Sequence, residues 1–192
     1  MIQVFLIGIA SSILINNIVL MQFMGICPFV GVSNRIESSI GMSAAVLLVL
    51  VIATLITYPI YHFVLLRAGI GFLDTITFIL VIASLVQIVE LLIRKFSPSL
   101  YRNLGAYLPL ITCNCAVLGL VQINIASRNN FFESMTFAIG TGLGFALVMI
   151  IFTTMREQLK SADVSKSFKG IPIALISAGI MALAFFGLTG LV

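Results

Sequence analysis

Long tracts without a charged side chain occupy most of the sequence, and they restrict the fold more than any other feature. Five of them span 1–34, 38–66, 103–127, 134–155 and 170–192, and a sixth, 72–93, holds ionisable groups only near its ends. Each reaches the roughly 20 residues that an α-helix needs to cross a bilayer. Only 8% of the residues are charged, against about 25% in a soluble domain. The sequence therefore predicts an integral membrane protein and excludes a soluble domain.

The tracts favour helices over the strands of a closed barrel. A barrel strand alternates apolar and polar side chains over about ten residues, and the run 44–56 does not alternate. The first 34 residues contain no Lys or Arg, so they lack the positive start of a cleaved signal peptide and we expect them to be retained. We predict an all-α membrane protein with six transmembrane helices, at about 3–24, 40–62, 72–93, 104–124, 133–155 and 171–191.

The basic residues predict how these helices are oriented. Lys and Arg accumulate in cytoplasmic loops, and here the second and fourth connections carry only Arg67 and Arg128. Both termini should therefore lie outside the cytoplasm. Because the basic residues are confined to short connections, the net charge of +4 is a topology signal. Membrane lipid is therefore an expected partner, and nucleic acid is not. The other eight basic residues are Arg35, Arg94, Lys95, Arg102, Arg156, Lys160, Lys166 and Lys169.

A weak internal repeat relates the two halves of the chain. Residues 16–20 (NNIVL) align with 114–118 (NCAVL), and Glu37-Ser38 aligns with Glu133-Ser134 at nearly the same offset. A unit of three helices that is repeated once has its second copy inverted in the membrane. Inverted repeats of this kind place their functional site near the midplane, where the repeats meet.

We therefore predict a single transmembrane domain, 1–192, built from two inverted three-helix repeats at about 1–95 and 100–192. Polar residues, Gly and Pro interrupt the first and fourth helices at corresponding places, and paired interruptions indicate a binding site. The interrupting residues are Asn16, Asn17, Gln22, Gly25 and Pro28 in the first helix, and Pro109, Thr112 and Asn114 in the fourth.

Two cysteines lie near these interruptions. At 1.5 Å per helical residue, Cys27 would be roughly 12 Å from Arg35, and Cys115 roughly 20 Å from Arg102, so both fall near the middle of a ~30 Å hydrocarbon layer. They could be metal ligands from facing helices, or simply small hydrophobes. As ligands, two thiols would need two more from another chain to complete an iron–sulfur site. On a continuous helix Cys113 would point about 200° away from Cys115, so we interpret Cys113 as a packing residue.

The sequence contains no motif for phosphate binding or catalysis. Gly140, Gly142 and Gly144 lack the basic and hydroxyl partners of a phosphate loop, and close helix packing explains them better. No Asp, Glu, Lys or Arg occurs at the centre of a predicted span, whereas ion pathways usually need such groups. We predict no catalytic residue in this chain, so any catalysis belongs to an assembly.

Several longer segments resemble one family of membrane subunits. They are RKFSPSLYR at 94–102, LPLIT at 108–112, NCAVLG at 114–119, and Asn16-Asn17 with GICPF at 25–29; weaker matches follow at 156–164 and 178–181. Together they resemble the RnfA/NqrE family over nearly the whole chain. Asn16-Asn17, Pro28 and the short connection between the second and third helices look like the Rnf branch rather than the Nqr branch.

The resemblance implies a membrane component of an ion-translocating electron-transport complex, a ferredoxin:NAD oxidoreductase coupled to Na⁺ or H⁺. It implies that Cys27 and Cys115 bind an intramembrane [2Fe–2S] cluster together with two cysteines of the inverted paralogue RnfE, and that RnfD, RnfG, RnfB and RnfC are further partners. Cys113 departs from the family pattern, in which Thr is frequent. The alternatives are the NqrE component of the Na⁺-translocating NADH:quinone reductase, a small secondary transporter with broken helices, and a structural scaffold protein.

The charge distribution makes one prediction about topology. Reporter fusions at both termini, and at the connections that contain Arg67 and Arg128, should report the outside of the cytoplasm, because eight of the ten basic residues lie in the other connections. Alkaline phosphatase and fluorescent protein fusions measure this directly. A C-terminus on the cytoplasmic side would contradict the six-helix arrangement.

Overall fold

The computed structural model describes residues 12–13, 17–33, 36–65, 74–96, 114–127, 129–160 and 168–189. Within them the regular elements are all helices and no strand occurs, which confirms the all-α prediction for this part of the chain. The elements are α2 (Ile18–Gln22), α3 (Ile26–Val32), α4 (Ile36–Ile60), the π-helix η1 (Tyr61–Leu65), α6 (Asp74–Phe96), α9 (Cys115–Ala126), α10 (Phe131–Lys160) and α11 (Ile171–Thr189).

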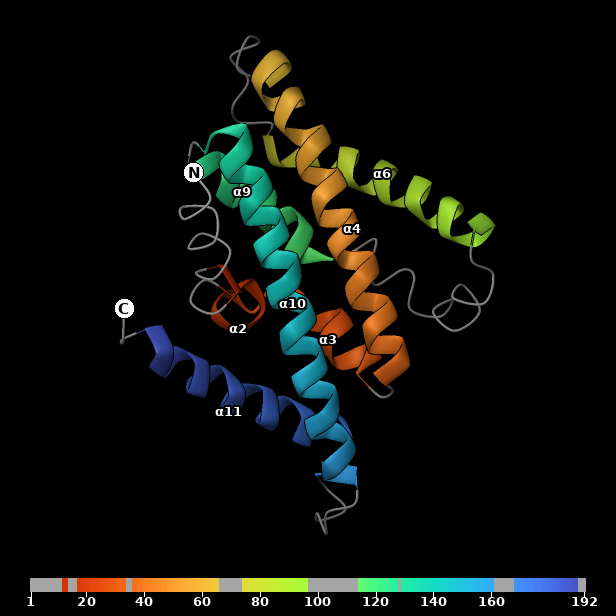
Figure 1. Ribbon diagram of the computed structural model, residues 1–192, viewed down its shortest axis with the longest axis vertical. Helices are drawn as coiled ribbons and strands as arrows, with labels where there is room; N and C mark the ends of the chain where they lie inside the picture. Colours follow the sequence, from red (N-terminus) through yellow and green to blue (C-terminus); the bar gives the residue numbers. More distant parts are fainter. Residues whose placement is uncertain are drawn as a thin grey trace.

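Helices α4 and α10 form the centre of the fold. They lie side by side and run in opposite directions (Figure 1). Ser39 Oγ, at the start of α4, and Thr153 Oγ1, near the end of α10, are 2.8 Å apart in a buried hydrogen bond. Gly142 permits the close approach, since an added Cβ would lie 3.0 Å from Leu47 Cγ. The packing explanation for the glycines is thus confirmed at Gly142.

Polar side chains inside α4 satisfy their hydrogen bonds within the helix. Ser43, Thr54 and Thr57 each donate to the carbonyl four residues earlier, at 2.7, 2.9 and 2.6 Å. This local bonding lets a hydroxyl sit among apolar neighbours without an unpaired donor. Near its end, α4 loses one backbone hydrogen bond, because Pro59 has no N–H to donate to the carbonyl four residues earlier. The chain then continues as the π-helix η1.

The remaining helices surround the central pair. The short helix α2 lies beside α10 near its middle, and α3 packs against α4 and the later turns of α10. Helix α9 packs against α4 and α6, and α6 and α11 extend obliquely from the pair (Figure 1). The core contains large side chains from several of these helices, and Phe29 of α3 stacks on Phe152 of α10 with ring centroids 4.1 Å apart. Apolar side chains on the outer faces, such as Leu80 and Leu183, are exposed, as expected for surfaces in contact with lipid or another apolar chain.

Two described helices, Ile36–Phe63 and Phe131–Lys160, are long and apolar enough to cross a membrane, and three shorter apolar helices occur at Thr75–Leu91, Cys115–Ala126 and Ile171–Gly187. Four of these helices coincide with the second, third, fifth and sixth predicted spans, and Cys115–Ala126 overlaps only the second half of the fourth, 104–124. Residues 1–11 and 101–113, which contain much of the first and fourth predicted spans, lie outside the described residues. The antiparallel course of α4 and α10 is what inverted repeats require, and the complete six-helix arrangement stays a prediction.

Candidate metal centre

Two asparagines precede helices with the same local geometry. Asn17 precedes α2 with φ −68° and ψ 113°, and Asn114 precedes α9 with φ −73° and ψ 107°. Each Oδ1 accepts a hydrogen bond of 3.1 Å from the backbone N–H two residues later, at Val19 and Ala116. This is the N-cap arrangement, in which a side chain replaces a missing helical partner. Both side chains are buried, so the interruptions occur inside the protein.

A second break follows α2 immediately. Phe23 and Gly25 have positive φ angles of 55° and 89°, and α3 begins after Gly25. The space around Gly25 is also restricted: an added Cβ would lie 3.3 Å from Ala116 Cβ, Asn114 Oδ1 and Phe145 Cε2. Both the backbone conformation and the close packing therefore require glycine here. The break in the first predicted helix is thereby held against the start of α9.

The contact between these breaks includes a cysteine sulfur. The Gly25 N–H donates to Cys115 Sγ, with 2.9 Å between nitrogen and sulfur. Cys115 is the first residue of α9, and Cys27 is the second residue of α3, two positions after Gly25. Both thiols are free, and both residues are exposed at the surface of the chain. Segments 88 residues apart in sequence thus each bring a thiol to the place where α3 and α9 begin.

The surroundings of Cys115 suit a negatively charged sulfur. A backbone N–H directed at the sulfur stabilises the charge that a metal-bound thiolate carries, and the N-terminus of the twelve-residue helix α9 adds the positive end of its dipole. The opposite end of α3 is also fixed: Arg156 Nη1 of α10 donates to the Val30 carbonyl at 2.8 Å and to Ser33 Oγ at 2.7 Å. Together these bonds hold α3 at both ends.

The donor set fits half of an iron–sulfur site. Iron–sulfur clusters are held mainly by Cys thiolates, four of them for a [2Fe–2S] cluster, and Cys27 and Cys115 supply two. Among the described residues no group of three or more His, Cys, Asp or Glu side chains gathers where it could hold a metal ion. A cluster bound by these two thiols would therefore need its other ligands from elsewhere, and the exposure of both cysteines leaves them accessible to another chain.

The structure corrects two details of the sequence interpretation. The N-cap positions make Asn17, and not Asn16, the counterpart of Asn114, so the proposed alignment of the halves was wrong by one residue. The direction assigned to Cys113 assumed a continuous helix through Cys115, and this assumption was wrong because Asn114 is extended. Cys113 itself lies outside the described residues.

The structure places some of the predicted interruptions at the ends of helices and others inside them. Asn17 and Gly25 do break the helical course of the chain, and Asn114 is non-helical and precedes α9, whereas Pro28 lies within the first turn of α3, where its missing N–H costs nothing. Gln22 is the last residue of α2, and Asn16, Pro109 and Thr112 lie outside the described residues. Sequence reasoning missed the role of Gly25 as a donor to Cys115, although its position two residues before Cys27 was a usable signal.

Comparison with known proteins identifies the family of the chain. The model of the family described as "Rnf-Nqr subunit, membrane protein" matches residues 5–192. The A-type component of the ion-translocating oxidoreductase complex of Hahella chejuensis is 52% identical over 188 residues, which cover 98% of this chain and 97% of the relative. Its counterpart in the Na⁺-translocating ferredoxin:NAD⁺ oxidoreductase complex of Acetobacterium woodii is 50% identical over 181 residues, or 94% of each chain.

The apolar helices and the family match thus define the chain as a membrane-embedded subunit of a larger complex. Within that class the chain belongs to the Rnf-Nqr family, and its resemblance to the RnfA/NqrE family is confirmed.

The packing around Gly25 generates a prediction with a matched control. Gly25→Ala should destabilise the detergent-extracted chain by about 1–3 kcal/mol more than Gly170→Ala. Both glycines have positive φ angles, 89° and 102°, but nothing lies within 4 Å of the Cβ position at Gly170. Both variants therefore incur the backbone cost, and only Gly25→Ala also crowds Asn114 and Phe145. Thermal and denaturant unfolding measure the difference, and equal losses would show that packing at Gly25 is not limiting.

Proposed function

We propose that the chain is a membrane component of an Rnf-type ion-translocating ferredoxin:NAD oxidoreductase, in which Cys27 and Cys115 supply half of an intramembrane [2Fe–2S] cluster. The other two ligands come from a partner protein, the inverted paralogue RnfE, at the interface between the chains. The chain is not an enzyme alone and acts as part of a translocase with the other Rnf proteins, RnfD, RnfG, RnfB and RnfC, in the bacterial inner membrane. The names of the relatives support this assignment, because they describe components of such complexes.

One observation carries the proposal: the Gly25 N–H donates to Cys115 Sγ at 2.9 Å. A left-handed glycine directs its backbone N–H at this sulfur, and this arrangement follows naturally if the sulfur bears the charge of a metal ligand. The two thiols are also exposed on a chain whose neighbouring residues Pro28, Phe29 and Ala116 are buried. Their exposure leaves both thiols accessible to a second chain.

The residues of this chain have distinct roles in such a site. Asn17 and Asn114 cap the helices that begin at the breaks, so the backbone can leave the helix at depth without unpaired N–H groups. Gly25 supports the charge on Cys115, and Arg156 fixes the far end of α3. When bound, the cluster would supply a one-electron carrier within the membrane. The protein fixes its position, and hydrogen bonds to its sulfurs set its potential.

A cluster at this depth would pass electrons across the membrane between donors and acceptors on its two sides. This chain is predicted to contain inverted repeats, and its paralogue has the opposite orientation. The cluster would therefore have nearly equivalent surroundings towards both faces of the membrane. Coupling to Na⁺ or H⁺ belongs to the assembly, in keeping with the absence of acidic and basic side chains at the centre of α4 and α10.

A secondary transporter that binds a solute at its broken helices is the second candidate. The observation that favours it is that Asn17 and Asn114 form equivalent breaks, the feature that typifies transporter binding sites. The NqrE component of a Na⁺-translocating NADH:quinone reductase is a third, and shares the cluster. Iron analysis separates the first two, since a transporter gives no reason for iron to depend on Cys27.

The ligand assignment predicts the outcome of three substitutions in the assembled complex. Cys27→Ser and Cys115→Ser should each abolish the [2Fe–2S] signal, because a cluster that loses a thiolate is not retained. Cys113→Ser should leave most of it, because the family resemblance assigns no ligand role to that position. Electron paramagnetic resonance of the reduced complex and iron per complex are the measurements. Equal loss in all three variants would contradict the assignment of Cys113.

A shared site also predicts how iron depends on assembly. This chain expressed alone should bind little iron, because its two exposed thiols are only half of the ligand set. It should also be sensitive to protease, because the surface that carries the thiols would face lipid without its partner. Co-expression with the inverted paralogue should restore the iron. Metal analysis and visible absorption of the purified chain test this, and a stoichiometric [2Fe–2S] signal in the lone monomer would refute the shared site.

A further inference from the structure

A phenylalanine with a left-handed backbone separates α2 from α3. Among the described residues, Phe23 is the one residue other than glycine that has a positive φ angle, with φ 55° and ψ 23°. It caps the C-terminus of α2, a position where the left-handed conformation is usually adopted by Gly or Asn. A bulky side chain is rare in this conformation, because its Cβ lies too close to the backbone. Such strain persists where the surrounding structure or the function requires it.

The residues that follow Phe23 hold this part of the chain against α9. Met24 is half-buried against the core and packs over Gly119 of α9, where an added Cβ would overlap the Met24 sulfur. Gly25 then donates its N–H to Cys115 Sγ at 2.9 Å. The break between α2 and α3 is therefore attached to α9 through Met24 and Gly25.

The ring of Phe23 does not share in this packing to the same extent. Its side chain is 57% exposed, whereas Phe29 and Phe145 are almost completely buried. The isolated chain thus gains little apolar burial from this ring, yet it holds the residue in an unfavourable backbone conformation. A contact with another molecule accounts for Phe23 better than packing within the chain does.

The residues around Phe23 favour protein over lipid as that molecule. Gln22 is exposed beside it, and the exposed Cys27 and Cys115 lie at the same break. We use the term thiol surface for Gln22, Phe23, Cys27 and Cys115. The predicted spans place this surface inside the hydrocarbon layer, where lipid tails offer no hydrogen-bond partner to an exposed amide. Another protein chain can cover the ring and pair the amide together.

We propose that Phe23 is the aromatic anchor of the interface with the chain that supplies the other two thiolates. The inference rests on the proposed function, which requires such a chain at Cys27 and Cys115. The ring inserts into an apolar pocket of the inverted paralogue, and the Gln22 amide pairs with an uncharged polar group beside that pocket. Aromatic side chains that fill a pocket within an interface contribute much of the binding energy. Closure of the interface around Phe23 also excludes water from the neighbouring thiols.

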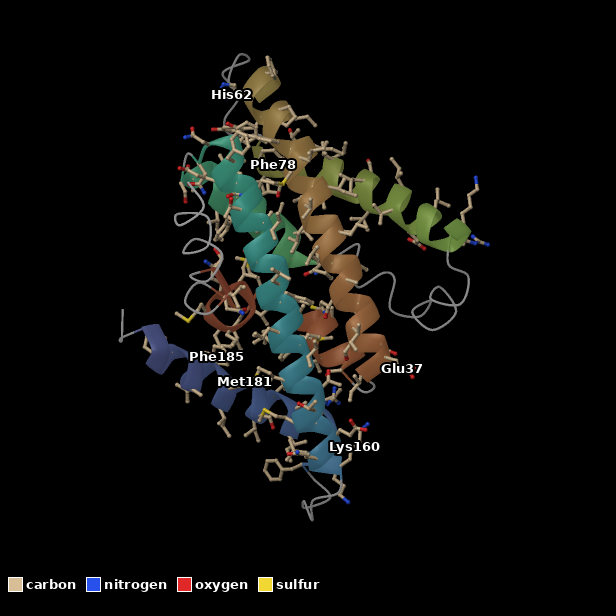
Figure 2. The ribbon with its side chains drawn as sticks, viewed as in Figure 1. Glu37, His62, Phe78, Lys160, Met181 and Phe185 are labelled. Atoms are coloured by element: carbon tan, nitrogen blue, oxygen red, sulfur yellow. The ribbon has the colours of Figure 1, made fainter. Side chains whose placement is uncertain are left out.

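Dissociation of the complex tests the anchor with a matched control. Phe23→Ala should speed the dissociation of this chain from the detergent-solubilised complex about tenfold or more, because it removes the anchor. Phe132→Ala should leave the rate unchanged. Phe132 is 83% exposed, but it lies in the first turn of α10, at the end of the bundle marked by His62 and away from α2 (Figure 2). Fluorescently labelled chain, chased with an excess of unlabelled chain, measures the rate. Equal rates for the two variants would overturn the anchor.

The stability of the lone chain separates an anchor from a structural role. Phe23→Gly introduces the residue best suited to the left-handed conformation. The lone, detergent-extracted chain should therefore unfold at the same or a higher temperature, while the complex dissociates about tenfold faster or does not form. A fall in the unfolding temperature of the lone chain together with the loss of association would assign Phe23 to the fold and overturn the proposal.

Gln22→Leu distinguishes the paralogue from lipid at the thiol surface. Leu leaves the partner's polar group unpaired, so dissociation should be about fivefold faster. An unchanged rate would indicate lipid at this position and overturn the contact. Two differently tagged copies of this chain that co-purify through the thiol surface would overturn the choice of partner. Iron content keeps the two proposals apart: an iron-free unsubstituted complex would refute the proposed function, whereas equal rates for Phe23→Ala and Phe132→Ala in an iron-containing complex would refute only the anchor.

Discussion

A backbone that leaves the helical conformation inside a membrane protein must find hydrogen-bond partners within the protein, and the centre of this fold depends on that constraint. Asn17 and Asn114 meet it with the same N-cap geometry at the start of α2 and α9. Asn17 also donates through Nδ2 to the carbonyls of Ile13 and Gly144, at 3.0 and 3.1 Å, which ties the first break to α10. Gly25 meets it differently, by donating to a cysteine sulfur.

These bonds explain why the candidate site lies where α3 and α9 begin. A continuous helix would point its N–H groups along its own axis and leave none for Cys115. The breaks free a backbone donor and turn α3 so that Cys27 reaches the surface in its first turn. The antiparallel pair α4 and α10 provides the rigid support, with Gly142 and Gly144 allowing Leu47 and Asn17 to pack closely against α10.

Much of this could be predicted from the sequence, because apolar tracts and helix-breaking residues have direct physical consequences. The helical character of the described residues, the breaks at Asn17 and Gly25, and the packing role of Gly142 could be predicted from residue type alone. The register of the two halves did not, because Asn16 and Asn17 are chemically identical and only the backbone distinguishes the capping residue. The direction predicted for Cys113 rested on a continuous helix, and that assumption was wrong because Asn114 is extended. The cavity of about 430 Å³ beside His62 is lined by residues of α4, η1, α9 and α10 that are distant in sequence, so no local pattern indicated it.

The central claim is that Cys27 and Cys115 hold iron jointly with a second chain. An anomalous difference map collected at the iron edge from crystals of the assembled complex tests it most directly, since it locates the metal without reference to any variant. The account predicts two adjacent iron peaks at the interface, with Cys27 and Cys115 of this chain and two cysteines of the partner as the surrounding sulfur ligands. Iron peaks ligated entirely by other chains, with Cys27 and Cys115 packed against lipid or apolar side chains, would contradict it.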